Sequence, residues 1–160
     1  MMNVNIICIG NLKEEWWRSA CAEYAKRLSA FCKFSIIELS ETRIAKSPTA
    51  GDIAKVLEDE GERILAKCRP GDLVMAMCIE GKIISSEEFA ADFASAALNS
   101  KSTIDIIIGG SYGLSPAVKQ RADMKLSMGR MTFPHQLARV MLCEQIYRAF
   151  SINSGSQYHK

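Results

Sequence analysis

Two glycine-bearing loops carry the residue types that could hold a small ligand. The first, residues 109–116, joins a predicted strand to a predicted helix. Glycine tolerates positive φ and lets a ligand approach the backbone closely, and ligands of open α/β sheets bind at the carboxyl ends of strands. The spacing differs from that of a GxGxxG dinucleotide loop and of a phosphate-binding P-loop. From the glycines alone, a ligand loop and a plain tight turn both stay open.

The second loop, residues 127–134, precedes the last predicted helix. Gly129 permits a sharp bend, and Pro134 presets the start of the helix. Consecutive backbone groups in such a loop can bind the edge of an adenine or a carboxylate. The alternative is an ordinary loop that only leads into the helix.

Histidines are rare, and both lie in the C-terminal third. His135 opens the last predicted helix, where a histidine is more often a helix-start residue than a catalyst. Tyr158, His159 and Lys160 end the chain. Terminal side chains are usually solvated, so these three act in chemistry only if the tail folds over a neighbouring site.

Charge is unevenly distributed along the chain. Residues 115–160 hold seven Lys and Arg against two Asp and Glu, a net of +5, whereas residues 1–114 have a net of −3, which together give the formal +2. A basic C-terminal third suits a polyanion such as nucleic acid. A solvated face without a partner is the alternative.

Cysteine and histidine spacing argues against a metal centre. The six cysteines include no CxxC pair, and the two histidines lack ligand spacing, so we expect free, mostly buried thiols and no metal. No stretch approaches the roughly 20 apolar residues of a membrane span, and the N-terminus lacks the features of a signal peptide. We therefore expect a cytoplasmic protein without membrane contact.

Hydrophobic periodicity predicts the elements that must position these loops. Strands are expected over residues 3–8, 34–39, 73–78 and 104–108, with 126–131 either strand or loop. Helices are expected over 13–31 and 52–67, from a Ser86 cap to residue 98, from Ser115-Pro116 onward, and over 134–150. Residues 151–160 are expected to form a polar tail. This alternation predicts an α/β fold, a mostly parallel sheet flanked by helices.

The last predicted helix is apolar on several sides. Glu144 and Arg148 are spaced to pair, but the apolar residues around them are too many for one buried stripe. A helix of this kind is buried on several sides. Either a partner subunit supplies the cover, or the helix is the central core helix of a monomer.

Taken together, the C-terminal motifs resemble one family. They are Ile108-Gly109-Gly110, Gly113-Leu114-Ser115, Leu126-Ser127, Thr132-Phe133-Pro134-His135, Arg139-Val140, Glu144-Gln145, Tyr147-Arg148-Ala149 and Tyr158-His159-Lys160. Their order and distances are similar to those of the ribosomal large-subunit RNA pseudouridine N3-methyltransferase family, of the SPOUT or α/β-knot superfamily. The resemblance covers essentially the whole chain.

This resemblance implies a single domain over 1–160, a trefoil knot over roughly 103–150, and a homodimer. S-adenosylmethionine is expected to bind bent in the knot. The implied cofactor contacts are Met77, Gly110, Gly129, Arg130, Met131, Thr132, Phe133 and Pro134. The chain departs from the family pattern at Met77-Cys78, where Leu and an acidic residue are frequent, and at Ser111-Tyr112, where Pro-Glu is frequent. The first change keeps an apolar contact, and the second leaves the need for an acidic side chain open.

The implied reaction is transfer of a methyl group to N3 of a pseudouridine in a 23S rRNA stem-loop of the assembled ribosome. An in-line displacement needs no metal, but the imide nitrogen must lose its proton. We expect His159 to assist deprotonation and Arg148 or Arg139 to stabilise the imidate and position phosphate.

RNA contact is expected from Tyr158, Tyr112 and Lys160, because aromatic planes hold unstacked bases and a lysine binds phosphate. Two alternatives stay open: a SPOUT methyltransferase that acts on another RNA such as tRNA, and a catalytically inactive module that binds the ribosome.

Overall fold

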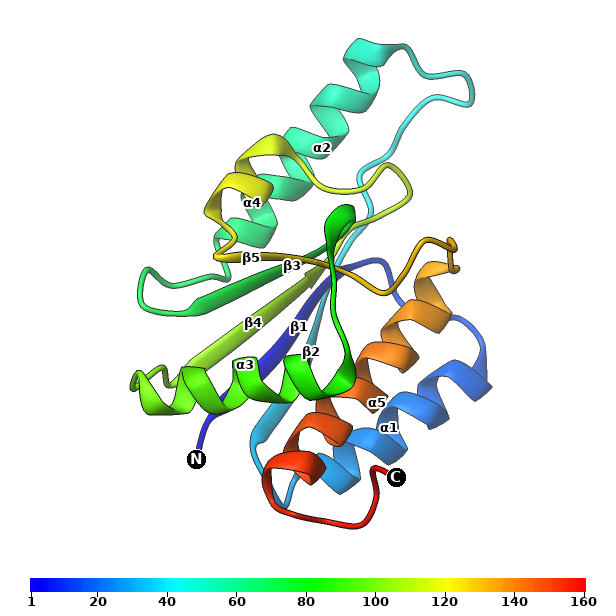
Figure 1. Cartoon of the computed structure of the whole chain (residues 1–160). Coiled ribbons are helices and arrows are strands. Elements are labelled where there is room, and N and C mark those ends of the chain that lie inside the picture. The colour runs from blue at the N-terminus through cyan, green and yellow to red at the C-terminus, as the bar shows by residue number, and fades with distance from the viewer.

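A five-stranded parallel sheet with helices on both faces makes up the protein in a computed structural model that describes residues 1–160 (Figure 1). The strand order is β2-β1-β4-β3-β5, and every adjacent pair is parallel. The strands are β1 (Asn3–Ile9), β2 (Lys33–Leu39), β3 (Leu73–Ile83), β4 (Thr103–Ile108) and β5 (Met124–Ser127). The helices are α1 (Glu15–Leu28), α2 (Ala50–Leu65), α3 (Ser86–Leu98), α4 (Pro116–Arg121) and α5 (His135–Asn153). The predicted α/β class and parallel sheet are confirmed.

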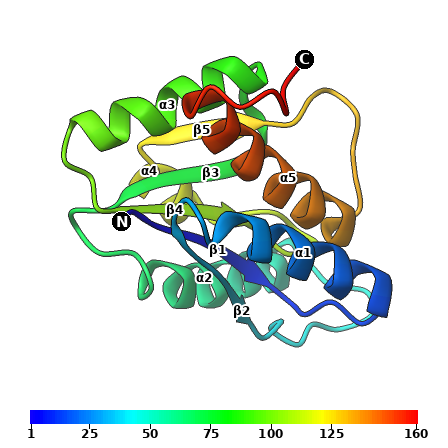
Figure 2. The ribbon, with the colours of Figure 1, turned by 90° about the horizontal axis from the view of Figure 1, so that it is seen from below.

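Alternating side chains along the strands build two cores. Ile6 of β1 and Ile106 of β4 lie in the larger core, whereas Ile7 and Ile107 lie in the smaller one. Helices α1, α3 and α5 cover the larger core, and α2 and α4 cover the smaller one; Figure 2 shows α2 on the face opposite α3 and α5. Burial on both faces explains why the strands are continuous apolar runs in the sequence.

Side-chain caps move two helix starts from their predicted positions. The Thr49 hydroxyl accepts from the N–H of Asp52 and the Asp52 carboxylate accepts from the N–H of Thr49, so α2 begins two residues early. The same reciprocal bonds join Ser85 and Glu88. Ser85, and not Ser86, is therefore the cap of α3.

Other element ends differ because of specific hydrogen bonds. The Arg18 guanidinium donates to the carbonyls of Leu12 and Lys13, which holds these residues outside α1. Helix α5 continues three residues past its predicted end, where the Asn153 side chain donates to the Ala90 carbonyl of α3 at 2.9 Å. Strand β5 ends at Ser127, so most of the segment over 126–131 is loop.

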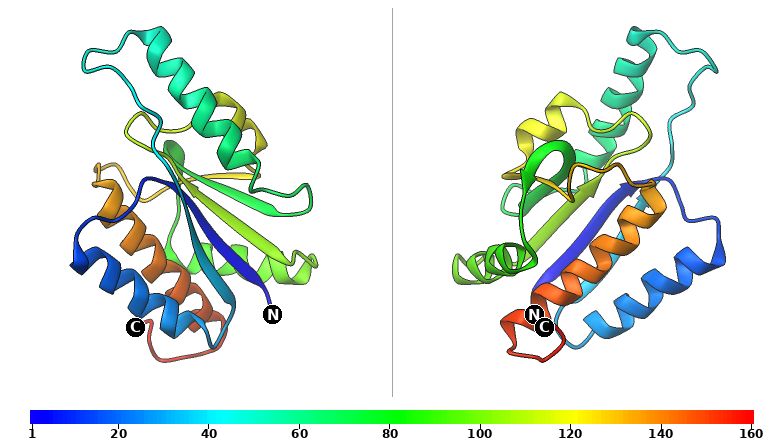
Figure 3. Two further views of the ribbon diagram at one scale, coloured as in Figure 1. Left: turned by 180° about the vertical axis from the view of Figure 1, so that it is seen from behind. Right: turned by 45° about the vertical axis from the view of Figure 1, so that its right-hand side comes forward.

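The pairing of β3 with β5 is interrupted within β3. After Met77 it makes an excursion through residues 78–81 and then pairs with β5 again at Lys82 and Ile83. Gly81 lies so close to Leu126 that a Cβ would overlap the Leu126 backbone. Figures 1 and 3 show this segment, in green, crossing the chain of β5. A trefoil knot needs such a crossing, and the knot itself stays a prediction.

Candidate functional site

The two glycine-bearing loops meet around one cavity at the carboxyl ends of β4 and β5, beside residues 77–80 of β3. This cavity, called here the loop cavity, has a volume of about 480 Å³, within the range of roughly 300–1,000 Å³ typical of ligand sites. Three chain segments form its wall: residues 77–80 within β3, 108–114 from the end of β4 onward, and 126–133 from the end of β5 onward. Lys119, His135 and Ala138 complete the wall from the helices.

Close packing holds the loop after β4 in place. The N–H of Gly113 donates to the Gly110 carbonyl at 3.0 Å, which closes a tight turn. A Cβ at Gly110 would lie 3.2 Å from Cγ2 of Ile9 and 3.3 Å from Oε1 of Glu60. Glycine at this position therefore lets the loop lie directly against β1 and α2.

The loop after β5 is pinned at its bend and leaves its backbone free beyond it. The Ser127 hydroxyl donates to the Gly129 carbonyl at 2.9 Å and accepts from the Gly129 N–H at 3.2 Å. Gly129 has a φ of +137°, a region that residues with a Cβ rarely adopt. None of the backbone N–H or carbonyl groups of residues 130–133 has a hydrogen-bond partner within the chain. These groups are available to a ligand in the cavity.

The residues implied as cofactor contacts come together here. Met77, Gly110 and Gly129 line the loop cavity, as do Arg130, Met131, Thr132 and Phe133. Pro134 is the N-cap of α5 and directly follows this wall. Tyr112 also lines the cavity, and its ring is 42% exposed at the rim.

One ion pair crosses the wall of the loop cavity. Nζ of Lys119 in α4 lies 2.5 Å from Oε1 of Glu80, which belongs to the excursion of β3. The bond to Lys119 lowers the pKa of the Glu80 carboxyl below its ordinary value. The remaining ionisable side chains of the wall are Cys78, Tyr112, Arg130 and His135.

The C-terminal tail folds back onto α5 and α3. The predicted pair of Glu144 and Arg148 is present, with Nη2 and Oε1 at 2.6 Å. Nη1 of Arg148 lies 3.1 Å from Nδ1 of His159, and Nε2 of His159 lies 2.9 Å from Oε1 of Glu87. Arg148 has only donors and Glu87 only acceptors, so the neutral tautomer of His159 with its proton on Nε2 satisfies both.

Tyr158 packs into the same arrangement. Its hydroxyl donates to Oε1 of Glu144 at 3.2 Å, and the Arg148 guanidinium lies 4.8 Å from the centre of its ring. Burial, together with the Glu144 charge, raises the pKa of Tyr158 to about 12. Lys160 is exposed beyond it. The sequence shows the Tyr158-His159 motif but not its seat on Glu144 and Glu87.

The tail and the loop cavity are far apart within one chain. The cavity takes its α5 contributions from His135 and Ala138, whereas the tail sits against Glu144 and Arg148. Ten residues of helix separate Ala138 from Arg148, about 15 Å along the axis. The tail therefore does not reach the loop cavity of its own chain.

Arg139 lies elsewhere again. Its side chain is 4% exposed, with Nη1 at 2.7 Å from Oε2 of Glu38, and Nη2 donates to the Gly10 carbonyl at 3.0 Å. It lines a cleft between α1 and β2 and not the loop cavity. Arg139 thus ties α5 to the carboxyl ends of β1 and β2.

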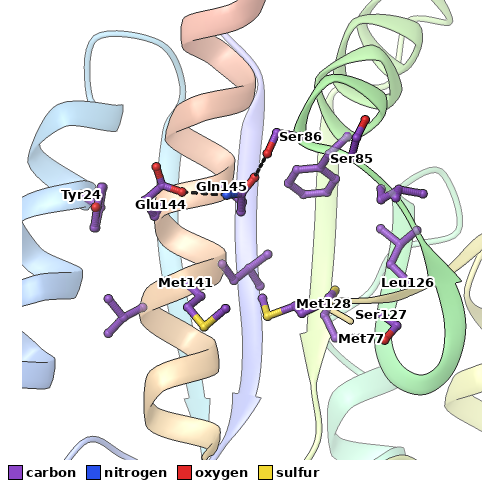
Figure 4. A pocket seen from close by; sticks show the side chains of 14 residues that line it. Tyr24, Met77, Ser85, Ser86, Leu126, Ser127, Met128, Met141, Glu144 and Gln145 are labelled. Atoms are coloured by element: carbon purple, nitrogen blue, oxygen red, sulfur yellow. Dashed lines mark hydrogen bonds between the residues drawn. The ribbon is translucent and has the colours of Figure 1, made fainter. Parts of the chain in front are cut away.

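A second cavity of about 610 Å³ opens between α1, α3 and α5 (Figure 4). Apolar side chains form most of its wall, among them Val140 and Met141. Its polar part comes from serines of α3 and β5 and from α5, where Gln145 accepts from the Ser86 hydroxyl at 2.6 Å and donates to Glu144 at 2.8 Å. Met77, Leu126, Ser127 and Met128 line both cavities. This second cavity is the uncovered apolar side of α5.

Metal-ligand groups, cysteines and membrane-spanning helices were the other features that the sequence raised. No group of three or more His, Cys, Asp or Glu side chains is arranged to hold a metal ion. All six cysteines are free thiols, as the sequence predicts. None of the helices combines the length and apolar character that crossing a membrane requires.

Comparison with known proteins places the chain in a family. Residues 2–159 match the family described as "Predicted SPOUT methyltransferase". The chain is 50% identical to the ribosomal RNA large subunit methyltransferase H of Lactiplantibacillus plantarum and 51% identical to that of Latilactobacillus sakei, over 99% of this chain and the full length of each relative.

A solved structure shares the fold. It is that of a probable methylase family protein from Haemophilus influenzae, with a TM-score of 0.57 and 14% identity over 99% of this chain and 71% of that protein. The full-length match at this level of identity to two relatives, and the family match to almost every residue, lead to one conclusion. The chain belongs to the SPOUT methyltransferase family.

Proposed function

We propose that this protein transfers a methyl group from S-adenosylmethionine to N3 of a pseudouridine in 23S rRNA of the assembled ribosome. The names of the full-length relatives support a ribosomal RNA substrate, and the basic C-terminal third supports a polyanion. The observation that carries the proposal is that residues 130–133, whose backbone groups have no hydrogen-bond partner in the chain, line a cavity of ligand size.

The residues of the loop cavity fit the proposed cofactor. A methyl donor with an adenine ring needs backbone donors and acceptors for the ring edge and an apolar surface for its face. The free N–H and carbonyl groups of residues 130–133 supply the first, and Met77, Leu126 and Met131 supply the second. Gly110 has no side chain, which lets the opposite loop pack against Ile9 and Glu60, and its backbone lines the cavity.

When bound, S-adenosylmethionine would supply a methyl group on a positively charged sulfur. The N3 nitrogen would attack the methyl carbon in line, and the sulfur would leave as a neutral thioether. The chain must hold the nucleophile about 3–3.5 Å from that carbon and remove the imide proton. Tyr112 lines the cavity and is exposed to solvent, and we assign it to stacking on the target base. We assign deprotonation to His159, stabilisation of the imidate to Arg148, and phosphate contacts to Lys160.

These tail residues can act at a loop cavity only if a second copy brings them there. Within one chain they lie about 15 Å along α5 from the cavity, and the apolar second cavity beside α5 is uncovered. We therefore propose a homodimer in which α5 and the second cavity lie at the interface. In this assembly Arg139, held by Glu38 and Gly10, positions α5 and does not touch the RNA.

Calorimetry and methyl transfer test the proposal. The full-length protein is titrated with S-adenosylmethionine and then incubated with labelled cofactor and either ribosomes, a naked 23S stem-loop, or tRNA. We expect micromolar binding, label in 23S rRNA of ribosomes, and far less label in the naked stem-loop, because the proposed RNA contacts, Tyr112, Tyr158 and Lys160, are few.

Three results would contradict the proposal in different ways. No heat of binding would favour a catalytically inactive ribosome-binding module. Label in tRNA but not in 23S rRNA would favour a relative with another substrate. Equal methylation of the naked stem-loop and of ribosomes would remove the requirement for the assembled ribosome. Mass spectrometry of 23S rRNA from a deletion strain should show one methyl group missing from one pseudouridine.

A further inference from the structure

The Glu80–Lys119 ion pair is the one place in the loop cavity where opposite charges meet. Nζ of Lys119 and Oε1 of Glu80 lie 2.5 Å apart, and both residues line the cavity. Arg130 is the other permanent charge of the wall, and no carboxylate lies within ion-pair distance of it. The pair joins two elements that the sequence does not connect, the excursion of β3 and helix α4.

Both partners keep the capacity to bind a further charge. The Lys119 ammonium can donate three hydrogen bonds, and Glu80 is its single ionic partner. The Glu80 carboxylate directs one oxygen at Lys119 and has a second. Their side chains are 32% and 52% exposed, so a ligand in the cavity can approach both.

The proposed methyl donor has a charged end that needs such partners. Its amino-acid part carries an α-carboxylate and an α-ammonium. Removing these charges from water costs much free energy unless opposite charges of the protein face them. The backbone groups of residues 130–133 suit the uncharged adenine edge instead. With the ligand carboxylate beside Lys119 and the ligand ammonium beside Glu80, each charge of the ligand would face an opposite charge of the protein.

We propose that Lys119 binds the α-carboxylate of the cofactor and Glu80 binds its α-ammonium. This assignment rests on the proposed function, because it requires the loop cavity to be the cofactor site. It makes the pair a specificity element that distinguishes cofactors with an amino-acid end from adenosine derivatives without one. It also gives the excursion of β3, which carries Glu80, a direct contact with the ligand.

The test compares two ligands that differ in this end alone. S-adenosylhomocysteine has the amino-acid end, and 5′-methylthioadenosine lacks it; both are uncharged at sulfur. Each is titrated calorimetrically into the wild-type protein and into Lys119→Met, Lys119→Arg, Glu80→Gln and Arg130→Met. Lys125→Met is the matched control. The positive charge of Lys125 also helps to lower the pKa of the Glu80 carboxyl, but Lys125 does not line the cavity. Thermal melting confirms that each variant is folded.

We expect Lys119→Met to raise the Kd of S-adenosylhomocysteine about tenfold, the size of one partly exposed charged hydrogen bond, and to leave that of methylthioadenosine within about twofold. Lys119→Arg keeps the charge and should restore most of the affinity. Glu80→Gln should weaken S-adenosylhomocysteine about threefold or more and spare methylthioadenosine. Lys125→Met should change neither ligand.

Several outcomes would overturn the assignment. Equal weakening of both ligands by Lys119→Met would show that the ion pair only holds the wall in shape. Selective weakening by Arg130→Met instead of Lys119→Met would place the carboxylate elsewhere. Tighter binding of S-adenosylhomocysteine by Glu80→Gln would show that Glu80 merely competes for Lys119. A wild-type protein that binds neither ligand would end the proposed function and this inference together, which separates that failure from the others.

Discussion

His159 has both ring nitrogens occupied within one chain. Arg148 takes Nδ1 and Glu87 takes Nε2, and Glu144 holds both Arg148 and Tyr158. A ring in this position cannot accept a proton at Nδ1 without displacing Arg148. His159 can therefore act as a base only when a bound RNA or a second subunit changes these contacts.

Replacing His159 with Ala should lower the single-turnover rate of methylation about 100-fold or more, the usual contribution of a positioned general base. The Kd of S-adenosylmethionine should not change, because the proposed cofactor contacts come from the loops of the cavity and not from His159. Rapid-quench assays with saturating cofactor and ribosomes measure the rate. Gln157→Ala, on an exposed residue of the same tail, is the control. An unchanged rate in His159→Ala would exclude His159 as the base.

The proposed cofactor site depends on the backbone conformation of the loop after β5. Its bend at Gly129 is held by Ser127, and the free backbone of residues 130–133 follows.

Strand β4 shows a different constraint, because Asp105 is fully buried in it. Asn5 donates to one Asp105 oxygen at 2.8 Å, and the other oxygen has no partner.

Gly129→Ala isolates backbone strain from crowding. No atom lies within 4 Å of the new methyl group, but a φ of +137° costs a residue with a Cβ about 1–3 kcal/mol. We expect the loop to shift and the Kd of S-adenosylmethionine to rise about tenfold or more. Gly71→Ala, where the space is also open and φ is not positive, should leave binding unchanged. Equal affinities in both variants would show that the bend does not shape the site.

Asp105→Asn tests the buried carboxyl. Burial, and next the nearby Asp72, raises the pKa of Asp105 to about 6. The folded state then binds its proton more tightly than the unfolded state, so stability falls as pH rises from about 4 to 6 and stays lower above that range. The neutral amide removes this loss.

The expected gain in unfolding free energy of Asp105→Asn is on the order of 1 kcal/mol at pH 7.5 and close to zero at pH 4. Urea unfolding at the two pH values measures it. Asp52→Asn is the control, because hydrogen bonds from Thr49 lower the pKa of Asp52. Its change in unfolding free energy should therefore have the opposite sign, a loss and not a gain. A gain for Asp105→Asn that is the same at both pH values would contradict the raised pKa.

The whole molecule divides the proposed chemistry between two places. The loop cavity lies at the N-terminal end of α5, and the tail is anchored near the C-terminal end. The second cavity exposes the apolar side of α5 between them. One chain therefore holds the proposed cofactor site and the tail apart, and the proposed dimer would bring the tail of one copy to the cavity of the other.

Met141→Glu should convert the proposed dimer to a monomer at micromolar concentration, because it places a charge on the apolar wall of the second cavity. Sedimentation equilibrium measures the mass. Ala54→Glu, an exposed position of α2 on the opposite face of the sheet, should leave the dimer intact. The monomeric variant should bind cofactor but lose methyl transfer; full activity as a monomer would contradict the shared site.

Local patterns in the sequence were enough to predict the order and type of the elements. Apolar β-branched runs such as 104–108 and the helical periodicity of 13–31 are short-range signals. The expectation that the two glycine-bearing loops share one site came from the cofactor contacts that the family resemblance implies. The implied cofactor contacts could be named only through the family resemblance, since single backbone contacts leave little mark in composition.

Only the tertiary structure distinguished residues that look alike in sequence. Arg139 and Arg148 lie on the same helix, yet Arg139 is buried against Glu38 and Arg148 faces the tail. Lys119 and Glu80 are 39 residues apart in separate elements, and their ion pair exists because the excursion of β3 returns beside α4. Such contacts depend on how distant segments pack, and no local pattern encodes the distance between them.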